Sequence, residues 1–170
     1  MSKPFDLVVH GATGFTVRLV VEYLLHRYPA GSGLRWAMGG RSAGKLAAVR
    51  DEVGAPADTP LVVTDSADPA SLAALMAQTR LVLTTVGPYQ LYGNELVAAC
   101  AASGVDYVDL CGEPAWMRAM IDAHEAQARA SGARIVFSCG FDSIPFDLGV
   151  LVLQNEMKAR HGHPASRVRG

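Results

Sequence analysis

Several features that would each assign the protein to a particular class are missing from the sequence. No run of about 18 apolar residues is present, so a transmembrane segment is not expected. The formal net charge is -1, without the basic excess that general binding to nucleic acid or to a membrane surface requires. No signal-peptide pattern precedes the first apolar stretch, and the 3 cysteines form no C-x-x-C pair. These absences favour a cytoplasmic protein with reduced thiols.

Two kinds of catalytic site are also not indicated. The Tyr-x-x-x-Lys pair of short-chain dehydrogenases is missing, because no tyrosine is followed four residues later by lysine. The tyrosines are Tyr23, Tyr28, Tyr89, Tyr92 and Tyr107. A metal site is not expected, since His161 and His163 lie in a polar tail without partner ligands. Cys111 and Cys139 end neighbouring predicted strands, where a metal or redox pair is the alternative, but they are more simply explained as small apolar residues. Catalytic residues stay unassigned.

The composition and the apolar pattern predict a well-buried α/β fold. Of the 170 residues, 50% are hydrophobic and 18% are charged. The predicted strands cover 5–9, 34–38, 61–64, 81–85, 106–110 and 134–138. The predicted helices cover 17–25, 43–53, 69–78, 93–103, 115–131 and 146–158. Their alternation predicts a Rossmann-type doubly wound parallel sheet of six strands in the order 3-2-1-4-5-6.

A glycine turn separates the first predicted strand from the first predicted helix. Gly11 allows the chain to leave the strand sharply, and Gly14 lets the backbone approach a phosphate closely. The unpaired N–H groups of the helix start attract an anion, and Thr13 and Thr16 can add hydroxyl donors. The turn therefore predicts a dinucleotide pyrophosphate site, with a plain strand–helix corner as the alternative. Val17 stands where a third small residue is expected, so it should push the helix outward or force local repacking.

The end of the second predicted strand indicates which dinucleotide the site takes. An NAD site carries Asp or Glu there, which accepts hydrogen bonds from the ribose hydroxyls. This sequence has Arg41 and Ser42 instead, with Lys45 one turn later. A guanidinium and a hydroxyl suit a 2′-phosphate, which a carboxylate would repel. We therefore predict NADP(H) as the cofactor, although Arg41 could be a solvated loop residue and Ser42 a helix N-cap.

Loops at the carboxyl ends of the other strands should line the same crevice. Asp65 follows the third predicted strand and is either an adenine-side contact or a turn residue. Gly87 and Pro88 follow the fourth strand, on the nicotinamide side. Tyr89 could donate to a substrate oxygen, but a tyrosine that opens a helix is more often a packed aromatic. The predicted cofactor contacts are Gly11, Thr13, Gly14, Phe15, Thr16, Arg41, Ser42, Lys45, Asp65, Val86, Gly87, Pro88 and Tyr89.

Further polar residues follow the predicted strands. Glu113 could be an acid or a substrate anchor, but a first-turn glutamate that satisfies its helix dipole is the simpler interpretation. Asp142 and Ser143 are most simply explained as caps of the helix that Pro145 begins, with a functional role as the alternative. His10 ends the first strand, where we expect packing beside the cofactor rather than proton transfer.

Several motifs taken together resemble one family. They are G-A-T-G-F-T at 11–16, G-R-S at 40–42, T-V-G-P-Y at 85–89, Y-G at 92–93, Y-V-D at 107–109, G-E at 112–113 and C-G-F-D-S-I-P-F-D-L-G at 139–149. This set resembles the saccharopine dehydrogenase-like oxidoreductases, in the branch that includes the trans-acting enoyl reductases of lipid biosynthesis. The resemblance spans nearly the whole chain, and the family usually has glycine where this chain has Val17.

The resemblance implies an organisation and an activity. Residues 1–143 are expected to form an NADP-binding domain, and residues 144–170 to lead toward a second, substrate domain that this chain lacks. The expected reaction is hydride transfer to an imine or an activated alkene, on a small-molecule or acyl, lipid-like substrate. Family members are considerably longer, so we expect the chain to be the cofactor domain of a longer enzyme and inactive by itself.

An NADP-binding sensor without catalysis is the alternative function. The segment 144–153 helps to separate the two, because it is too apolar for a free helix surface. A two-domain reductase requires such a helix and a sensor does not. We therefore expect the helix after Pro145 to pack on a second domain or on a second subunit, which makes a homo-oligomer one expected form.

Overall fold

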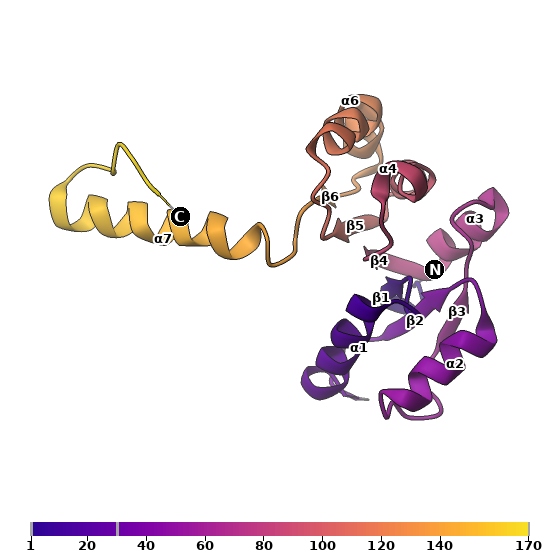
Figure 1. Cartoon of the computed structure of the whole chain (residues 1–170). Helices are drawn as coiled ribbons and strands as arrows, with labels where there is room; N and C mark the ends of the chain where they lie inside the picture. Colours follow the sequence, from indigo (N-terminus) through magenta and orange to yellow (C-terminus); the bar gives the residue numbers. More distant parts are fainter. Residues whose placement is uncertain (1, 30, 170) are drawn as a thin grey trace.

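The computed structural model describes residues 2–29 and 31–169. Within them, a parallel sheet in the order β3-β2-β1-β4-β5-β6 lies between two layers of helices (Figure 1). The strands are β1 (Phe5–His10), β2 (Trp36–Gly40), β3 (Leu61–Val63), β4 (Thr79–Thr84), β5 (Asp106–Asp109) and β6 (Ile135–Val136). The helices are α1 (Phe15–Arg27), α2 (Ala43–Glu52), α3 (Pro69–Gln78), α4 (Tyr89–Tyr92), α5 (Asn94–Ser103), α6 (Pro114–Ser131) and α7 (Ile144–His161). The predicted fold class and strand order are confirmed.

Two buried clusters hold the sheet and its helices together. On one face, α1 and α2 pack side chains such as Val21 and Leu46 against Val9 of β1. On the other face, α3, α5 and α6 form a larger cluster in which Leu75 packs with Val82 of β4. The central strands are therefore covered on both sides, as their near-continuous apolar sequence predicts.

Val17 is an interior residue of the first cluster. Its side chain is 0% exposed, and it lies in the group of α1 and α2 residues that covers β1 and β2. Gly40 of β2 helps to make room there, because a Cβ at that position would lie 3.3 Å from Leu46. The structure therefore accommodates Val17 inside the core, and the expectation that it displaces α1 or forces local repacking stays a prediction.

Several element boundaries differ from those predicted. β2 includes Gly39 and Gly40, because both residues lie in register with a neighbouring strand, which outweighs the low strand propensity of glycine. β6 contains only Ile135–Val136, and the backbone leaves the strand at Ser138, whose φ is 59°. The short helix α4 was not predicted as a separate element. Asp68 caps α3 by accepting from two backbone N–H groups, with Pro69 next to it, as predicted.

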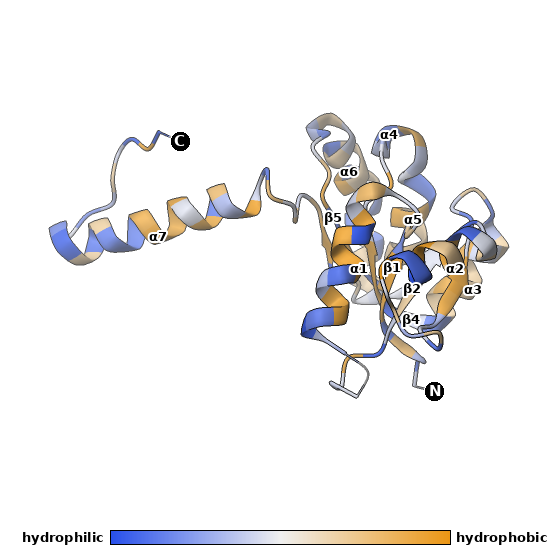
Figure 2. Ribbon diagram, turned by 60° about the horizontal axis from the view of Figure 1, so that its bottom comes forward, coloured by the Kyte–Doolittle hydropathy of each residue, from blue (hydrophilic) through white to orange (hydrophobic). Residues whose placement is uncertain are grey.

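Helix α7 leaves the sheet and extends away from it (Figure 1). It starts at Ile144 and ends at His161, so it is longer than predicted at both ends. None of its residues, all of them described, is buried. Apolar residues occur along much of its length (Figure 2), and Leu151 and Val152 are 54% and 67% exposed. Across the described ranges, none of the helices combines the length and the hydropathy needed to cross a membrane.

Candidate functional site

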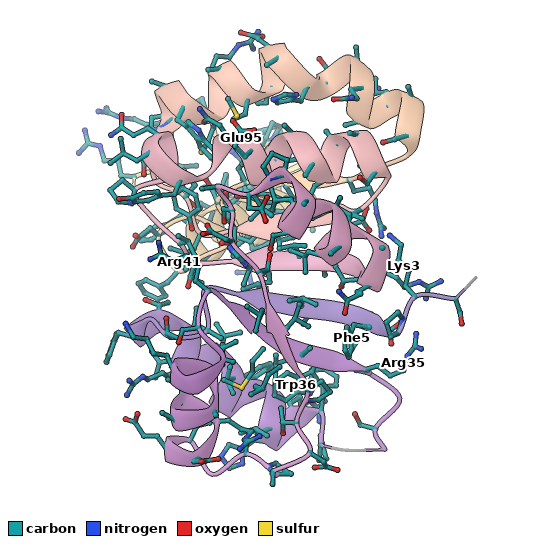
Figure 3. The ribbon with its side chains drawn as sticks, turned by 90° about the vertical axis from the view of Figure 1, so that its right-hand side faces the viewer. Lys3, Phe5, Arg35, Trp36, Arg41 and Glu95 are labelled. Atoms are coloured by element: carbon teal, nitrogen blue, oxygen red, sulfur yellow. The ribbon has the colours of Figure 1, made fainter. Side chains whose placement is uncertain are left out.

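A cleft of about 570 Å³ lies at the carboxyl ends of the strands, beside the glycine turn. Figure 3 shows Arg41 and Glu95, which line this cleft, at one end of the sheet and Lys3 and Arg35 at the opposite end. The predicted contacts that line the cleft are Gly11, Thr13, Gly14, Phe15, Thr16, Arg41, Asp65, Val86 and Gly87. The predicted contacts outside its lining are Ser42, Lys45, Pro88 and Tyr89. His10, which was expected to pack beside the cofactor, also lines the cleft, and the lining residues not predicted there are Gly40, Ser66, Ala67, Thr85, Leu91, Tyr92, Asn94 and Glu95.

The glycine turn has the backbone geometry that a phosphate site requires. Gly11 has φ of 87°, and a Cβ there would overlap Val86 of the loop after β4. Gly14 is the N-cap residue of α1, where the described residues provide no side-chain cap. A Cβ on Gly14 would meet only the Gly11 oxygen, at 3.6 Å. The free N–H groups at the start of α1 are thus available to an anionic group in the cleft.

Of the residues predicted to contact the 2′-phosphate after β2, only one lies in the cleft. Arg41 lines the cleft and is exposed. Ser42 is instead the N-cap of α2, and its Oγ accepts a hydrogen bond from Lys45 N at 3.3 Å. The helix cap that the sequence allowed for Ser42 is therefore confirmed, and Arg41 is the cation placed in the cleft.

His10 and Ser66 form a polar contact beneath the cleft that the sequence pattern did not show. The His10 Nε2 lies 2.8 Å from Ser66 Oγ, although the two residues are 56 positions apart. His10 is 3% exposed, and burial lowers its pKa to about 4; Asp65 raises this pKa and Arg41 lowers it. The imidazole is consequently neutral over the physiological pH range. Asp65 is a turn residue, since its Oδ1 accepts from Ala67 N at 3.0 Å, and it also lines the cleft.

Tyr89 is a packed aromatic and does not line the cleft. Its side chain is 4% exposed, and its ring centroid lies 5.4 Å from that of Trp116. Its hydroxyl donates to Thr84 O at 3.3 Å and accepts from Leu110 N at 3.4 Å, and burial raises its pKa. The short helix α4 turns Tyr89 inward and leaves Tyr92 in the cleft lining, 55% exposed. Tyr89 is therefore the packed aromatic that the sequence favoured, and its contact with a cofactor or substrate stays a prediction.

Glu113 caps a helix other than its own. Its carboxylate accepts from Tyr89 N at 2.7 Å and from Gln90 N at 3.0 Å, which are the first N–H groups of α4. The dipole that it satisfies therefore belongs to α4, whereas the sequence suggested α6. Both carboxylate oxygens are engaged, so Glu113 is not placed to act as a free acid.

A buried carboxylate joins the ends of β5 and β6. Asp109 is 2% exposed and accepts from Tyr107 Oη at 2.8 Å, from Cys111 N at 3.0 Å and from Ser138 N at 2.8 Å. Burial raises the pKa of Asp109 against the opposing effect of these bonds. Cys111 is buried beside it, whereas Cys139 is exposed. These contacts fix the loops that face the same edge of the sheet as the cleft.

The residues before α7 do not cap it through their side chains. Ser143 is the N-cap residue, but its side chain makes no capping hydrogen bond within the described chain. The backbone provides the contacts instead, since Ile144 N donates to Gly140 O at 3.0 Å. Ser143 is therefore the N-cap residue of α7, but the capping hydrogen bond expected from its side chain is not observed.

Together, the strand order, the glycine turn and the cleft define a dinucleotide-binding α/β domain. The comparison with known families is more specific, because the model of the saccharopine dehydrogenase NADP binding domain matches residues 7–136. The chain belongs to this family, and its cofactor is NADP(H).

Relatives with similar sequences are considerably longer. Trans-acting enoyl reductases of Mycobacterium tuberculosis and Mycobacterium leprae are each 49% identical over 152 residues. The match covers 89% of this chain and 36% of each relative. The chain thus spans about a third of the length of these relatives.

Two solved structures share the fold at low sequence identity. Saccharopine dehydrogenase from Saccharomyces cerevisiae has a TM-score of 0.70 at 16% identity, over 92% of this chain and 32% of that one. The triphenylmethane reductase of a Citrobacter species, complexed with NADP(H), has a TM-score of 0.55 at 22% identity, over 78% and 48% of the two chains. These similarities support the fold alone.

Proposed function

We propose that the chain is the NADP-binding part of an oxidoreductase that reduces the carbon–carbon double bond of an unsaturated acyl compound. The observation that carries the NADP-binding part of the proposal is a single cleft that combines the glycine turn with Arg41 and has no carboxylate at the end of β2. The relatives are named enoyl reductases, which favours an activated alkene over an imine as the acceptor. An acyl or other small-molecule substrate is part of this proposal.

The cleft residues would bind and orient the cofactor. The backbone of Gly11 and Gly14 would hold the pyrophosphate at the start of α1, and Arg41 would bind the 2′-phosphate. Val86 and Gly87 would lie against the nicotinamide half. When bound, NADPH supplies a hydride, and the role of these residues is to hold it at a fixed position.

The binding part of the proposal is tested by calorimetric titration of the chain with NADPH and then with NADH. Tighter binding of NADPH is the expected result, because only this cofactor offers Arg41 a phosphate. Equal affinity for the two cofactors would contradict the assignment of Arg41. Absence of binding to either cofactor would contradict the assignment of the cleft.

We also propose that residues 1–143 are the cofactor domain and that α7 begins a separate, partner-binding segment. Its support is the exposure of apolar side chains such as Leu148 and Leu151, which are 49% and 54% exposed. Packing on a second copy would produce a homo-oligomer. Light scattering should then give a mass above that of the monomer, and Leu151→Glu should return it to the monomer. A monomeric wild type would contradict self-association.

An NADP-binding sensor is the second candidate, and one observation favours it. Tyr89 and Glu113, the two proton donors considered for the nicotinamide side, are both engaged in contacts within the domain. Turnover is measured as NADPH oxidation by the chain with a crotonyl thioester, and only a positive result separates the two candidates. Turnover supports the reductase, whereas cofactor binding without turnover favours a sensor or a requirement for further protein.

A further inference from the structure

The imidazole of His10 reaches across β2 to the loop after β3. His10 lies in register with Gly39 of the neighbouring strand β2, and Ser66 follows the strand on the other side of β2. A Cβ on Gly39 would lie 2.9 Å from Val8 Cγ1 and 3.6 Å from His10 Cα. Gly39 therefore lets Val8 pack closely on this face of β2, and the His10–Ser66 contact of 2.8 Å joins the chain on the two sides of β2.

The buried environment selects the direction of this hydrogen bond. The Nδ1 of His10 is buried and has no hydrogen-bond partner in the described chain. A proton on Nδ1 would leave a buried N–H group unsatisfied, which proteins rarely tolerate, whereas a bare acceptor nitrogen is less costly. The proton therefore belongs on Nε2, and Nε2–H donates to Ser66 Oγ. The hydroxyl proton of Ser66 is then free to be donated elsewhere.

Ser66 can direct that proton into the cleft, beside an acceptor supplied by Asp65. Ser66 is half-buried and lines the cleft, as does Asp65. Asp65 uses Oδ1 for Ala67 N, and the described residues provide no partner for its Oδ2. An acceptor and a donor thus lie on adjacent residues, on the side of the cleft formed by the β2 and β3 loops. Adenine presents the complementary pair, an amino donor beside a ring nitrogen acceptor.

We propose that Ser66 donates a hydrogen bond to an adenine ring nitrogen of the cofactor, and that His10 is the positioning residue that orients the Ser66 hydroxyl. The inference rests on the proposed function of the cleft. In this proposal His10, Asp65 and Ser66 recognise the adenine base of the cofactor. Arg41 recognises its 2′-phosphate independently. A hypoxanthine analogue presents an oxygen acceptor in place of the amino group, so the same cleft should bind it more weakly.

The test replaces His10 with glutamine or with asparagine, because their side-chain amides can take the places of the two ring nitrogens of histidine. Glutamine at position 10 places an amide near the Nε2 position and can still reach Ser66, whereas asparagine is too short. The variants are Ser66→Ala, His10→Gln, His10→Asn and Ser66→Ala combined with His10→Asn. Calorimetry gives the affinity of each for NADPH, NADH and the hypoxanthine analogue of NADPH, after circular dichroism has confirmed folding.

We expect Ser66→Ala and His10→Asn each to bind NADPH roughly 5-fold to 10-fold more weakly, the scale of one neutral hydrogen bond. His10→Gln should bind within about 2-fold of the wild type, and the double variant no more weakly than Ser66→Ala alone. The preference for NADPH over NADH should remain in all variants, because Arg41 is unchanged.

Three results would overturn the proposal. The first is wild-type affinity in Ser66→Ala. The second is additive losses in the double variant, which would show that His10 acts only through general packing. The third is equal wild-type affinity for NADPH and its hypoxanthine analogue. A wild type that binds no dinucleotide would overturn the proposed function of the cleft. The three results above would overturn only the roles given to Ser66 and His10, so the two failures are distinguishable.

Discussion

The two halves of the cleft differ in how completely this chain builds them. On the adenine side, Arg41, Asp65 and Ser66 lie beside the glycine turn, and a buried histidine supports them. On the nicotinamide side, the lining includes Leu91 and Tyr92, which are 66% and 55% exposed. Tyr89 and Glu113, which lie near that side, are engaged in contacts within the domain. Under the proposed function, the adenine side would select the cofactor within this domain, while the exposed Leu91 and Tyr92 on the other side are suited to being covered by further protein.

Gly11→Ala should have the largest effect, because the glycine turn serves both halves. The substitution places a side chain at φ of 87° and in overlap with Val86. We expect a loss of about 3 kcal/mol of unfolding free energy and a loss of NADPH binding of roughly 100-fold or more. Urea unfolding and calorimetry measure the two effects.

Gly33→Ala is the matched control for this substitution. Gly33 has φ of 93°, but a Cβ at this position would meet no described atom within 4 Å. The substitution should cost only about 1 kcal/mol and leave NADPH binding unchanged. Equal effects of the two substitutions would show that overlap with the β4 loop is unimportant.

The buried histidine on the adenine side should make stability depend on pH. The pKa of His10 is about 4 in the folded protein and 6.5 ordinarily, so the unfolded chain takes up the proton first as pH falls. Stability from this group is complete above the ordinary pKa and is lost between these two values, by up to about 3 kcal/mol. Urea unfolding at about pH 7 and about pH 4.5 should therefore show a smaller loss for His10→Gln than for the wild type. A similar loss in both proteins would contradict the buried neutral histidine.

Arg41→Ala isolates the 2′-phosphate contact. We expect NADPH binding to weaken by about 1.5–3 kcal/mol, the scale of a charge-assisted hydrogen bond, and NADH binding to stay nearly unchanged. Arg129→Ala on α6, which removes a cation paired with Glu125, is the charge-matched control. If both cofactors lose affinity equally in the Arg41 variant, this residue does not distinguish them.

Tyr89→Phe should have the smallest effect and examines the nicotinamide side. Only two long hydrogen bonds are removed, so we expect a loss of about 1 kcal/mol of stability and no change in NADPH affinity. Tyr92→Phe, at an exposed position in the cleft lining, should not alter stability. A strong loss of cofactor affinity in Tyr89→Phe alone would restore this residue as a cofactor contact.

Much of the fold could be predicted from the sequence because its signals are local. The glycine turn, the apolar strands and the Asp68 cap each lie within a few residues, and they appear in the structure where expected. Strand β2 was predicted two residues too early, at 34–38, because the pairing of Gly39 with β1 and β3 and of Gly40 with β3, which no local signal shows, holds both glycines in the sheet.

The candidate site was predicted less completely, because its missing parts depend on long-range contacts. The His10–Ser66 contact joins the ends of two strands that are separated by a third, and no spacing in the sequence indicates it. Tyr89 and Tyr92 lie on different sides of α4, and the sequence does not show which of the two faces the cleft. The polar character of Glu113 was recognised, but the helix that it caps could be identified only from the structure.

The cap that Glu113 provides has a consequence for the order of folding. Tyr89 and Glu113 are 24 positions apart, and the described chain gives α4 no side-chain cap of its own at Pro88. A helix of 4 residues has too few hydrogen bonds to persist alone. The segment after β4 that contains α4 should therefore become ordered only after β5 has paired with β4. Hydrogen exchange at Tyr89 N and Gln90 N should consequently follow the opening of β5 rather than that of α5.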